Sequence, residues 1–183
     1  MKKVWIYALA WASAALVALT LAVITPNETN VMGRLPSLVA KRLDQQPVNL
    51  PEGLPAGRTL ALVAFRHNQK QDIESWINGL QLRNDPSISW VRMPVINDPG
   101  DPAGRSAVET RLLSRFPNES ERASMLPVFT DRAAFVRATG VSGTDQAVVL
   151  VLNRNGEVLA RAQGHFDPDK AQALRETLHS HRE

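Results

Sequence analysis

The stretch Leu60 to Trp76, LALVAFRHNQKQDIESW, most constrains the fold of this chain. The mostly apolar run from Thr59 to Arg66 is typical of a strand covered on both faces. Asn68 is placed to cap a helix, and the apolar residues after it recur at the spacing of one helix face: Ile73, Trp76, Ile77 and Leu80. The sequence therefore predicts a buried strand that runs through a short turn into a helix packed on the sheet, with Trp76 in the core.

Further strands and helices alternate along the rest of the chain. Strands are predicted at 88–96, where Pro94 indicates an edge or a bulge, at 126–130, and at 147–152 and 157–164, which the Asn155-Gly156 turn joins. Four helices are predicted. The first begins at a capping box of Ser106 and Glu109, and the second is a single turn after Asn118. The third runs from Asp131 to Thr139 and is closed by Gly140, and the last is capped by Asp167, with Pro168 as its first residue. This order predicts an α/β fold, a central mixed β-sheet with helices on both faces.

The N-terminus predicts a membrane segment. Val4 to Ile24 contains 21 residues without a charged side chain, enough for a helix to cross a hydrocarbon core about 30 Å thick. We favour an uncleaved signal anchor over a cleaved signal peptide, although Thr20-Leu21-Ala22 offers a cleavage site. Lys2 and Lys3 then stay in the cytoplasm. The expected location is the bacterial inner membrane, single-pass, with the C-terminal domain in the periplasm, or the periplasm itself after cleavage.

The domain organisation follows from these features. Residues 1–25 are predicted as the anchor or signal, and residues 26–56 as a tether that prolines interrupt, with one hint of a helix at 35–43. The folded domain is predicted at 57–183.

The composition excludes two classes of function. The chain has no cysteine, so it has no thiol chemistry of its own, and its stability depends on an ordinary core. The net charge of +3 does not indicate nucleic-acid binding: removing Lys2 and Lys3 from the 21 basic residues leaves 19, against 18 acidic ones. No basic block suggests a phosphate-binding stripe.

Three segments together resemble thioredoxin-like proteins. Ala147 to Gly164, AVVLVLNRNGEVLARAQG, is similar to their closing hairpin, and a capped helix follows it. Leu126 to Val141 resembles the strand and helix that peroxiredoxin-like and thiol-disulfide reductase-like members insert before that hairpin, and Leu60 to Trp76 resembles their first core strand and active-site helix. The resemblance covers residues 56–180 and implies a three-layer thioredoxin-like sandwich.

Departures from this pattern carry the functional information. Where oxidoreductases of this fold carry their cysteines, this chain has Arg66 to Asp72, and where they carry a cis-proline it has Gln146, Ala147 and Val148. The segments FRHNQKQDIESW and LVLNRNGEVLARAQG are similar to a cysteine-free branch, the fungal mitochondrial ATP synthase assembly factors and their bacterial relatives. That resemblance implies a non-catalytic role in assembling a membrane protein complex.

The candidate binding site is the groove between the turn at the end of the first strand and the loop before the hairpin. We expect it to bind a membrane or periplasmic protein, and we expect no catalytic residue, no metal and no cofactor. Its candidate residues are Arg66, His67, Asn68, Gln69, Asp145, Gln146 and Ala147.

Simpler structural roles compete with this interpretation. Arg66 ends a buried strand and is expected to form a salt bridge rather than bind a ligand. His67 is expected to be a lone turn histidine, because no carboxylate or second histidine lies at ligand spacing. Asp98 and Asp101 are expected to form a solvated turn rather than a calcium site.

Two alternative functions stay open. One is an enzyme that uses Arg66 and His67 without a thiol, in which case both should line one concave pocket with a third polar group. The other is a degenerate thiol-disulfide or peroxiredoxin-like protein that acts beside a cysteine-bearing partner.

Overall fold

The computed structural model describes residues 31–180, and these form one compact unit. The predicted anchor at Val4 to Ile24 lies outside the described residues. Within 31–180, no helix is long and apolar enough to cross a membrane.

A five-stranded mixed sheet forms the centre, in the order β5-β4-β3-β6-β7. Its strands are β3 (Arg58–Ala64), β4 (Trp90–Ile96), β5 (Val128–Phe129), β6 (Val148–Asn153) and β7 (Val158–Gln163). β3 pairs parallel with β4, placing Leu62 beside Arg92, and antiparallel with β6, placing Leu62 beside Val149. Every residue of β6 is buried, as the apolar run predicts for a strand covered on both faces.

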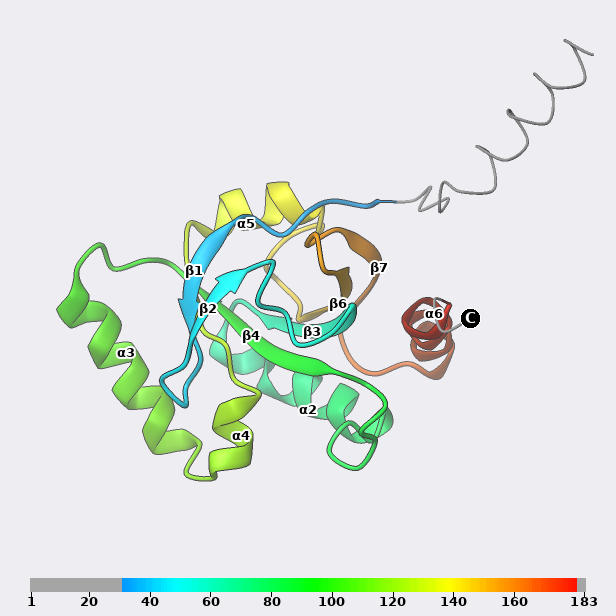
Figure 1. Cartoon of the computed structure of the whole chain (residues 1–183), viewed down its shortest axis with the longest axis horizontal. Coiled ribbons are helices and arrows are strands. Elements are labelled where there is room, and N and C mark those ends of the chain that lie inside the picture. Colours follow the sequence, from blue (N-terminus) through cyan, green and yellow to red (C-terminus); the bar gives the residue numbers. More distant parts are fainter. Residues whose placement is uncertain (1–30, 181–183) are drawn as a thin grey trace, which may run out of the picture. The chain divides into compact units, whose positions relative to one another are not determined.

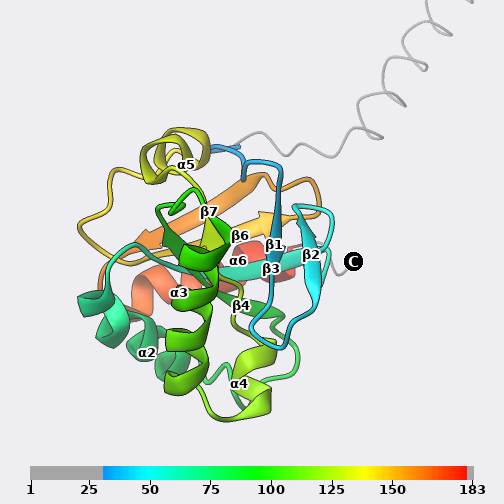
Figure 2. The ribbon, with the colours of Figure 1, turned by 90° about the vertical axis from the view of Figure 1, so that its left-hand side faces the viewer.

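Helices cover both faces of this sheet, which confirms the predicted α/β class. On one face, α2 (Lys70–Gly79) and α6 (Pro168–His179) share a core with the alternate residues Leu60 and Leu62 of β3. On the other face, α5 (Arg132–Thr139) and the segment 35–54 pack on Ala61 and Val63. α3 (Pro102–Arg115) and α4 (Glu119–Ala123) lie beside β4, with α3 at the side of the molecule (Figures 1 and 2).

Residues 34–54 are folded, so the predicted tether and its helical hint are wrong for this part of the chain. They contain a hairpin of β1 (Leu38–Lys41) and β2 (Pro47–Leu50). The buried apolar residues of the segment 34–54 are Leu35, Ala40, Leu43, Leu50 and Leu54. Prolines do not prevent this, because Pro36 and Pro51 lie outside the strands and Pro47 begins one. The hairpin covers a sheet face that would otherwise expose apolar side chains.

The local signals were right where they depend on a few neighbouring residues. Gly140 ends α5 with φ 69°, and Gly156 lies in the hairpin turn with φ 75°. Asp167 caps α6, accepting a hydrogen bond from the backbone N–H of Lys170 at 3.0 Å, and Pro168 is the first helical residue.

Two predicted helix starts are wrong. α3 begins at Pro102, because Asp101 accepts a hydrogen bond from Gly104 N at 2.7 Å and so caps the helix before Ser106 is reached. Asn68 does not cap α2: it lies inside a single 3₁₀ turn (His67–Gln69), and Gln69 occupies the cap position.

Pro94 lies inside the sheet rather than at its edge. It pairs with Ala64 of β3, and β5 flanks the other side of β4. On that side it falls between the isolated Arg92–Met125 bridge and the Val95–Val128 pair, where the ladder is interrupted. A residue without an N–H is tolerated there because no regular ladder bond is required of it.

Candidate functional site

The turn that follows β3 is held closed by Gln69, whose side chain is 3% exposed. Its Oε1 accepts hydrogen bonds from the backbone N–H groups of Phe65 at 2.7 Å and Arg66 at 3.1 Å. Its Nε2 donates to the carbonyl oxygen of Thr144 at 2.8 Å. One side chain therefore satisfies buried backbone groups of the turn and joins it to the loop before β6.

The loop before β6 supplies the other predicted site residues. Arg66 Nη2 lies 2.9 Å from Asp145 Oδ1, so Arg66 forms the salt bridge expected of it. Gln146 is exposed, whereas Ala147 is buried in the core. The structure thus brings the two predicted segments together, with Arg66, His67, Asn68, Asp145 and Gln146 on the surface and Gln69 and Ala147 inside. Whether this surface binds a partner stays a prediction.

A cavity of about 250 Å³ adjoins the turn. It lies between α2, the ends of β3 and β4, and α3. Its interior is formed by buried apolar side chains, among them Leu62, Phe65, Ile73, Met93 and Val95. Leu112 of α3 and Phe116, the residue that follows α3, also line the cavity and are half-buried. Sequence reasoning did not find this cavity, because its walls come from segments far apart in the chain.

Arg92 is the buried charge of this region, with its residue 4% exposed. Its Nη1 lies 2.9 Å from Glu74 Oε1 and its Nη2 3.8 Å from Glu121 Oε1. Its guanidinium lies 5.8 Å from the Trp90 ring and 5.5 Å from the Phe116 ring. Burial lowers the pKa of Arg92, and the charge of Glu74 opposes that shift.

The hydrogen-bonding capacity of Arg92 is only partly used. Among residues 31–180, its Nε and Nη2 have no hydrogen-bond partner. The signal in the sequence was the two-residue spacing of Ile88, Trp90 and Arg92, which places Arg92 on the same face of the strand as two apolar side chains.

Cationic side chains gather around the cavity, drawn from four segments of the chain. The exposed ones are Arg66, Lys70 and Arg115, and Arg132 is half-buried with its Nε donating to Val95 O at 3.1 Å. Glu74 is the single carboxylate among the described residues that line the cavity, and it already pairs with Arg92 and, at 2.7 Å, with Arg83. Arg66 is also paired, with Asp145, so the positive charge of the rim comes mainly from Lys70 and Arg115.

His67 is exposed, as expected of a turn histidine, but it has a neighbour that the sequence did not indicate. Arg115 Nη1 of α3 lies 3.2 Å from its Nδ1. Because a guanidinium can only donate, Nδ1 accepts, which corresponds to a neutral imidazole with its proton on Nε2. His67 and Arg66 line the same cavity, which is one part of the geometric requirement of the enzyme alternative.

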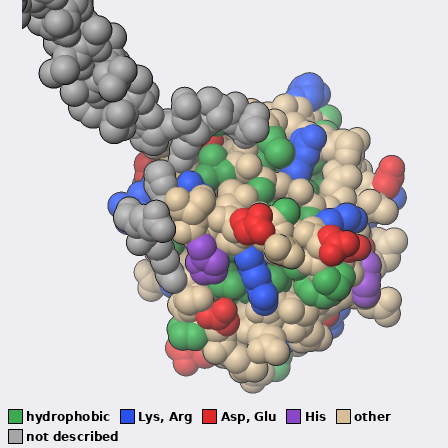
Figure 3. Space-filling view, turned by 90° about the vertical axis from the view of Figure 1, so that its right-hand side faces the viewer, with side chains coloured by type: hydrophobic (Ala, Val, Ile, Leu, Met, Phe, Trp, Pro, Cys, Tyr) green, Lys and Arg blue, Asp and Glu red, His purple; other side chains and the backbone are tan. Residues whose placement is uncertain are grey.

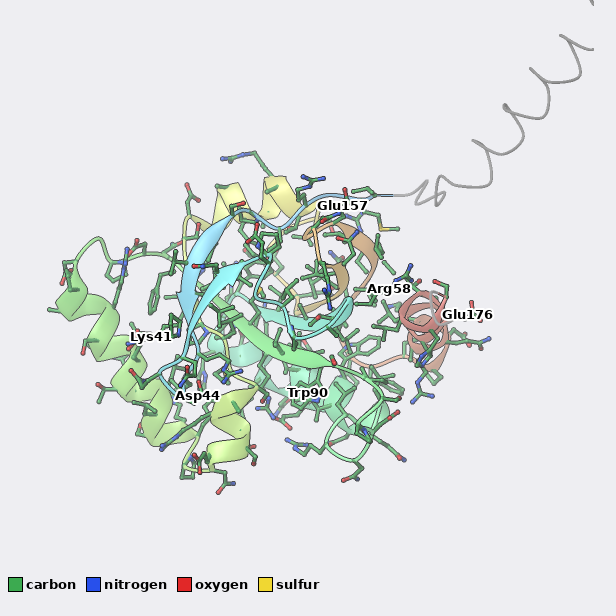
Figure 4. All side chains as sticks on the ribbon, in the orientation of Figure 1. Lys41, Asp44, Arg58, Trp90, Glu157 and Glu176 are labelled. Atoms are coloured by element: carbon green, nitrogen blue, oxygen red, sulfur yellow. The ribbon has the colours of Figure 1, made fainter. Side chains whose placement is uncertain are left out.

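The helix that covers the cavity is held mainly by polar contacts. None of the residues of α3 is buried, although Val108, Leu112, Leu113 and Phe116 form an apolar stripe. Lys41, at the end of β1, reaches Glu109 of α3 at 2.7 Å (Figure 4). Arg122 Nε donates to the Phe116 carbonyl oxygen at 2.7 Å. These contacts hold α3 near its middle and at its C-terminal end, while its apolar stripe stays half-buried.

The remaining expected sites have structural roles. Trp76 is fully buried, and its Nε1 donates to Gly164 O at 2.9 Å. Asp98 pairs with Arg105, which lowers the pKa of Asp98, and Asp101 caps α3. On the face shown in Figure 3, acidic and basic side chains are interspersed without a block of one sign.

Solved structures share this fold. One is a candidate electron transfer protein from Aquifex aeolicus VF5, with a TM-score of 0.55 and 13% identity over 80% of this chain and 97% of its own. Another is BsSco, a member of the Sco family of cytochrome c oxidase assembly proteins, with a TM-score of 0.52 and 13% identity over 82% and 95%. A third is a candidate thioredoxin from Neisseria meningitidis, with 0.51 and 14% over 82% and 93%.

These similarities define the fold as thioredoxin-like, in agreement with the predicted three-layer sandwich. At identities of 13% and 14% they show the fold alone. No family model and no curated protein sequence matches the chain.

Proposed function

We propose that this chain is a non-redox thioredoxin-like binding module that assists the assembly of a membrane protein complex. It is tethered through Val4–Ile24 with its folded domain in the periplasm, and it takes no cofactor. The partner is a membrane or periplasmic protein that docks on the surface formed by Arg66, His67, Asn68, Asp145 and Gln146. The predicted resemblance to the ATP synthase assembly factors supports the same kind of role.

The observation that carries this proposal is the turn at the end of β3. Oxidoreductases of this fold carry reactive cysteines there, whereas this chain has Arg66 to Gln69 and no cysteine anywhere. Gln69 and the Arg66–Asp145 pair close the turn with ordinary hydrogen bonds. A junction that keeps its shape and lacks its nucleophile is suited to binding rather than to thiol exchange. BsSco, which shares the fold, belongs to a family of assembly proteins.

Site-specific crosslinking in the source cell tests the proposal. A photoreactive residue is placed at Asn68 or at Gln146, and a matched control at Gln172, on the exposed side of α6. We expect Asn68 and Gln146 to crosslink to the same subunit of a membrane complex, and Gln172 to give no such product. Deleting the chain should lower the amount of that assembled complex. Full assembly without the chain, or no crosslink from either position, contradicts the proposal.

A second candidate function is an enzyme without a thiol nucleophile. It is supported by one observation, that Arg66 and His67 line the same cavity. The single lining carboxylate is occupied by two arginines, so the geometry favours binding over acid-base chemistry. A bound compound that is recovered chemically changed, and unchanged with His67→Gln, would favour the enzyme instead.

A further inference from the structure

We propose that the cavity between α2, β4 and α3 is a docking pocket for one large apolar side chain, carried by an acidic peptide segment of a partner protein. This inference rests on the proposed binding function and specifies the chemistry of the segment that is bound. The pocket adjoins the turn and shares Arg66 and His67 with the surface predicted from the sequence, which it extends toward α3.

The size and lining of the pocket define the anchor. Its interior side chains are apolar and buried, including Leu62, Ile73 and Met93. A water molecule, which has one non-hydrogen atom, occupies about 30 Å³ of liquid. A volume of about 250 Å³ therefore holds about eight non-hydrogen atoms. This is close to the size of one aromatic side chain such as Phe, which has seven non-hydrogen atoms. Anchors of this kind dominate the binding energy of protein interfaces.

The charge of the rim defines what surrounds the anchor. Arg66, Lys70 and Arg115 are exposed at the mouth, and the single lining carboxylate, Glu74, is paired with Arg92 at 2.9 Å. Arg66 is paired with Asp145 at 2.9 Å, but Lys70 and Arg115 have no carboxylate partner among residues 31–180, so the mouth keeps a net positive charge. A peptide with acidic residues on both sides of its apolar anchor is complementary to this positive charge. The attraction also raises the rate at which the peptide and the pocket associate.

The packing of α3 explains how an occupant would be held. Leu112 and Phe116 face the cavity but remain half-buried, and α3 buries none of its residues. An inserted side chain would remove apolar surface of α3 from water and complete its packing against β4. An occupant would therefore also stabilise α3.

Titration calorimetry with synthetic peptides tests the ligand chemistry, using the full chain in lipid nanodiscs. We expect the capped peptide Asp-Glu-Phe-Glu-Asp to bind, and replacement of its Phe by Ala to weaken binding at least about tenfold. Replacing its four acidic residues by lysine should abolish binding, and raising the salt from 0.05 to 0.3 M should weaken it severalfold. Equal binding of the Ala or lysine peptide overturns the proposal.

Variants of α3 locate the site. Leu112→Trp fills the cavity and should weaken peptide binding at least about tenfold. Leu113→Trp is the matched change on the side of α3 away from the cavity, and it should leave peptide binding unchanged. Arg115→Glu reverses a rim charge and should weaken binding by a similar factor, while Arg111→Glu, an exposed position that does not line the cavity, should have little effect. Thermal melts confirm that each variant is folded.

Two results contradict this inference without touching the proposed function. One is unchanged peptide binding by both Leu112→Trp and Arg115→Glu. The other is binding of octanoate, a small apolar carboxylate, with no binding of the peptide, which would assign the cavity to a small molecule. In either case crosslinking from Asn68 and Gln146 would still report the partner of the turn, because those residues do not line the cavity.

Discussion

Gln69 Nε2 donates a hydrogen bond to the carbonyl oxygen of Thr144 at 2.8 Å, and this contact joins two segments 75 positions apart. The same side chain accepts from two backbone N–H groups that follow β3. The turn that would carry reactive thiols in an oxidoreductase of this fold is thus part of the folded core, and its shape is maintained by an amide side chain.

Replacing Gln69 by alanine should lower the free energy of unfolding by about 2 to 3 kcal/mol, because it leaves buried backbone groups without hydrogen-bond partners. Urea unfolding of the full chain measures the change. Asn68→Ala is the control: Asn68 is exposed, and its replacement should cost less than about 0.5 kcal/mol. Equal losses for the two variants would show that the amide does not hold the turn.

Glu74→Gln should destabilise the protein by about 3 kcal/mol, because it leaves the charge of Arg92 buried without its closest carboxylate. Glu121 lies farther from Arg92, at 3.8 Å, so Glu121→Gln should cost less than about 1 kcal/mol. Arg92→Met combined with Glu74→Gln should recover part of the loss, since no unpaired charge remains inside. A double variant less stable than Glu74→Gln alone would contradict this account.

Asp44 should contribute to the pH dependence of stability. Arg42 donates to it from Nε at 3.0 Å and from Nη2 at 2.5 Å, and these hydrogen bonds lower the pKa of Asp44 in the folded state. A carboxyl with a lowered folded pKa stabilises the protein above its unfolded pKa, and this contribution is lost as the pH falls through the folded pKa.

Asp44→Asn should therefore reduce the loss of stability between about pH 5 and pH 2. The change should be less than about 1 kcal/mol, because the pair is close to solvent. Arg42→Met should reduce the same acid-induced loss of stability by a similar amount. Unfolding curves across this pH range measure both variants. If both variants lose as much stability between about pH 5 and pH 2 as the unsubstituted protein does, the prediction is contradicted.

Gly140→Ala should lower the free energy of unfolding by about 2 kcal/mol or more. Gly140 ends α5 with φ 69°, a conformation that costs an L-residue about 1 to 2 kcal/mol, and a Cβ there would clash with the carbonyl oxygen of Met32. Gly57→Ala is the matched control, since a Cβ at Gly57 would have nothing within 4 Å. Thermal unfolding compares the two, and equal stability would argue against the close approach of residues 32 and 140.

The sequence predicted which two segments of the chain form the candidate binding site. The sequence placed the 66–69 turn opposite residues 145–147 because the resemblance supplied the fold, and the Arg66–Asp145 ion pair confirms that the two segments meet. It could not distinguish exposed from buried members of this set. Ala147 begins an apolar run and is buried with it, whereas Gln69 is inside because of its hydrogen bonds to Thr144 and the turn, which local hydrophobicity does not encode.

The sequence by itself determined the elements whose signals are local. The apolar run of β6, the Asn155-Gly156 turn, the cap at Asp167 and the stripe of α2 each depend on residues within a few positions of one another. Only the tertiary structure decided that residues 34–54 cover one face of the sheet, that Arg92 is buried, and that α2, β4 and α3 enclose a cavity. These features arise from contacts between distant segments, and their free energy comes from shared burial rather than from local conformational preference.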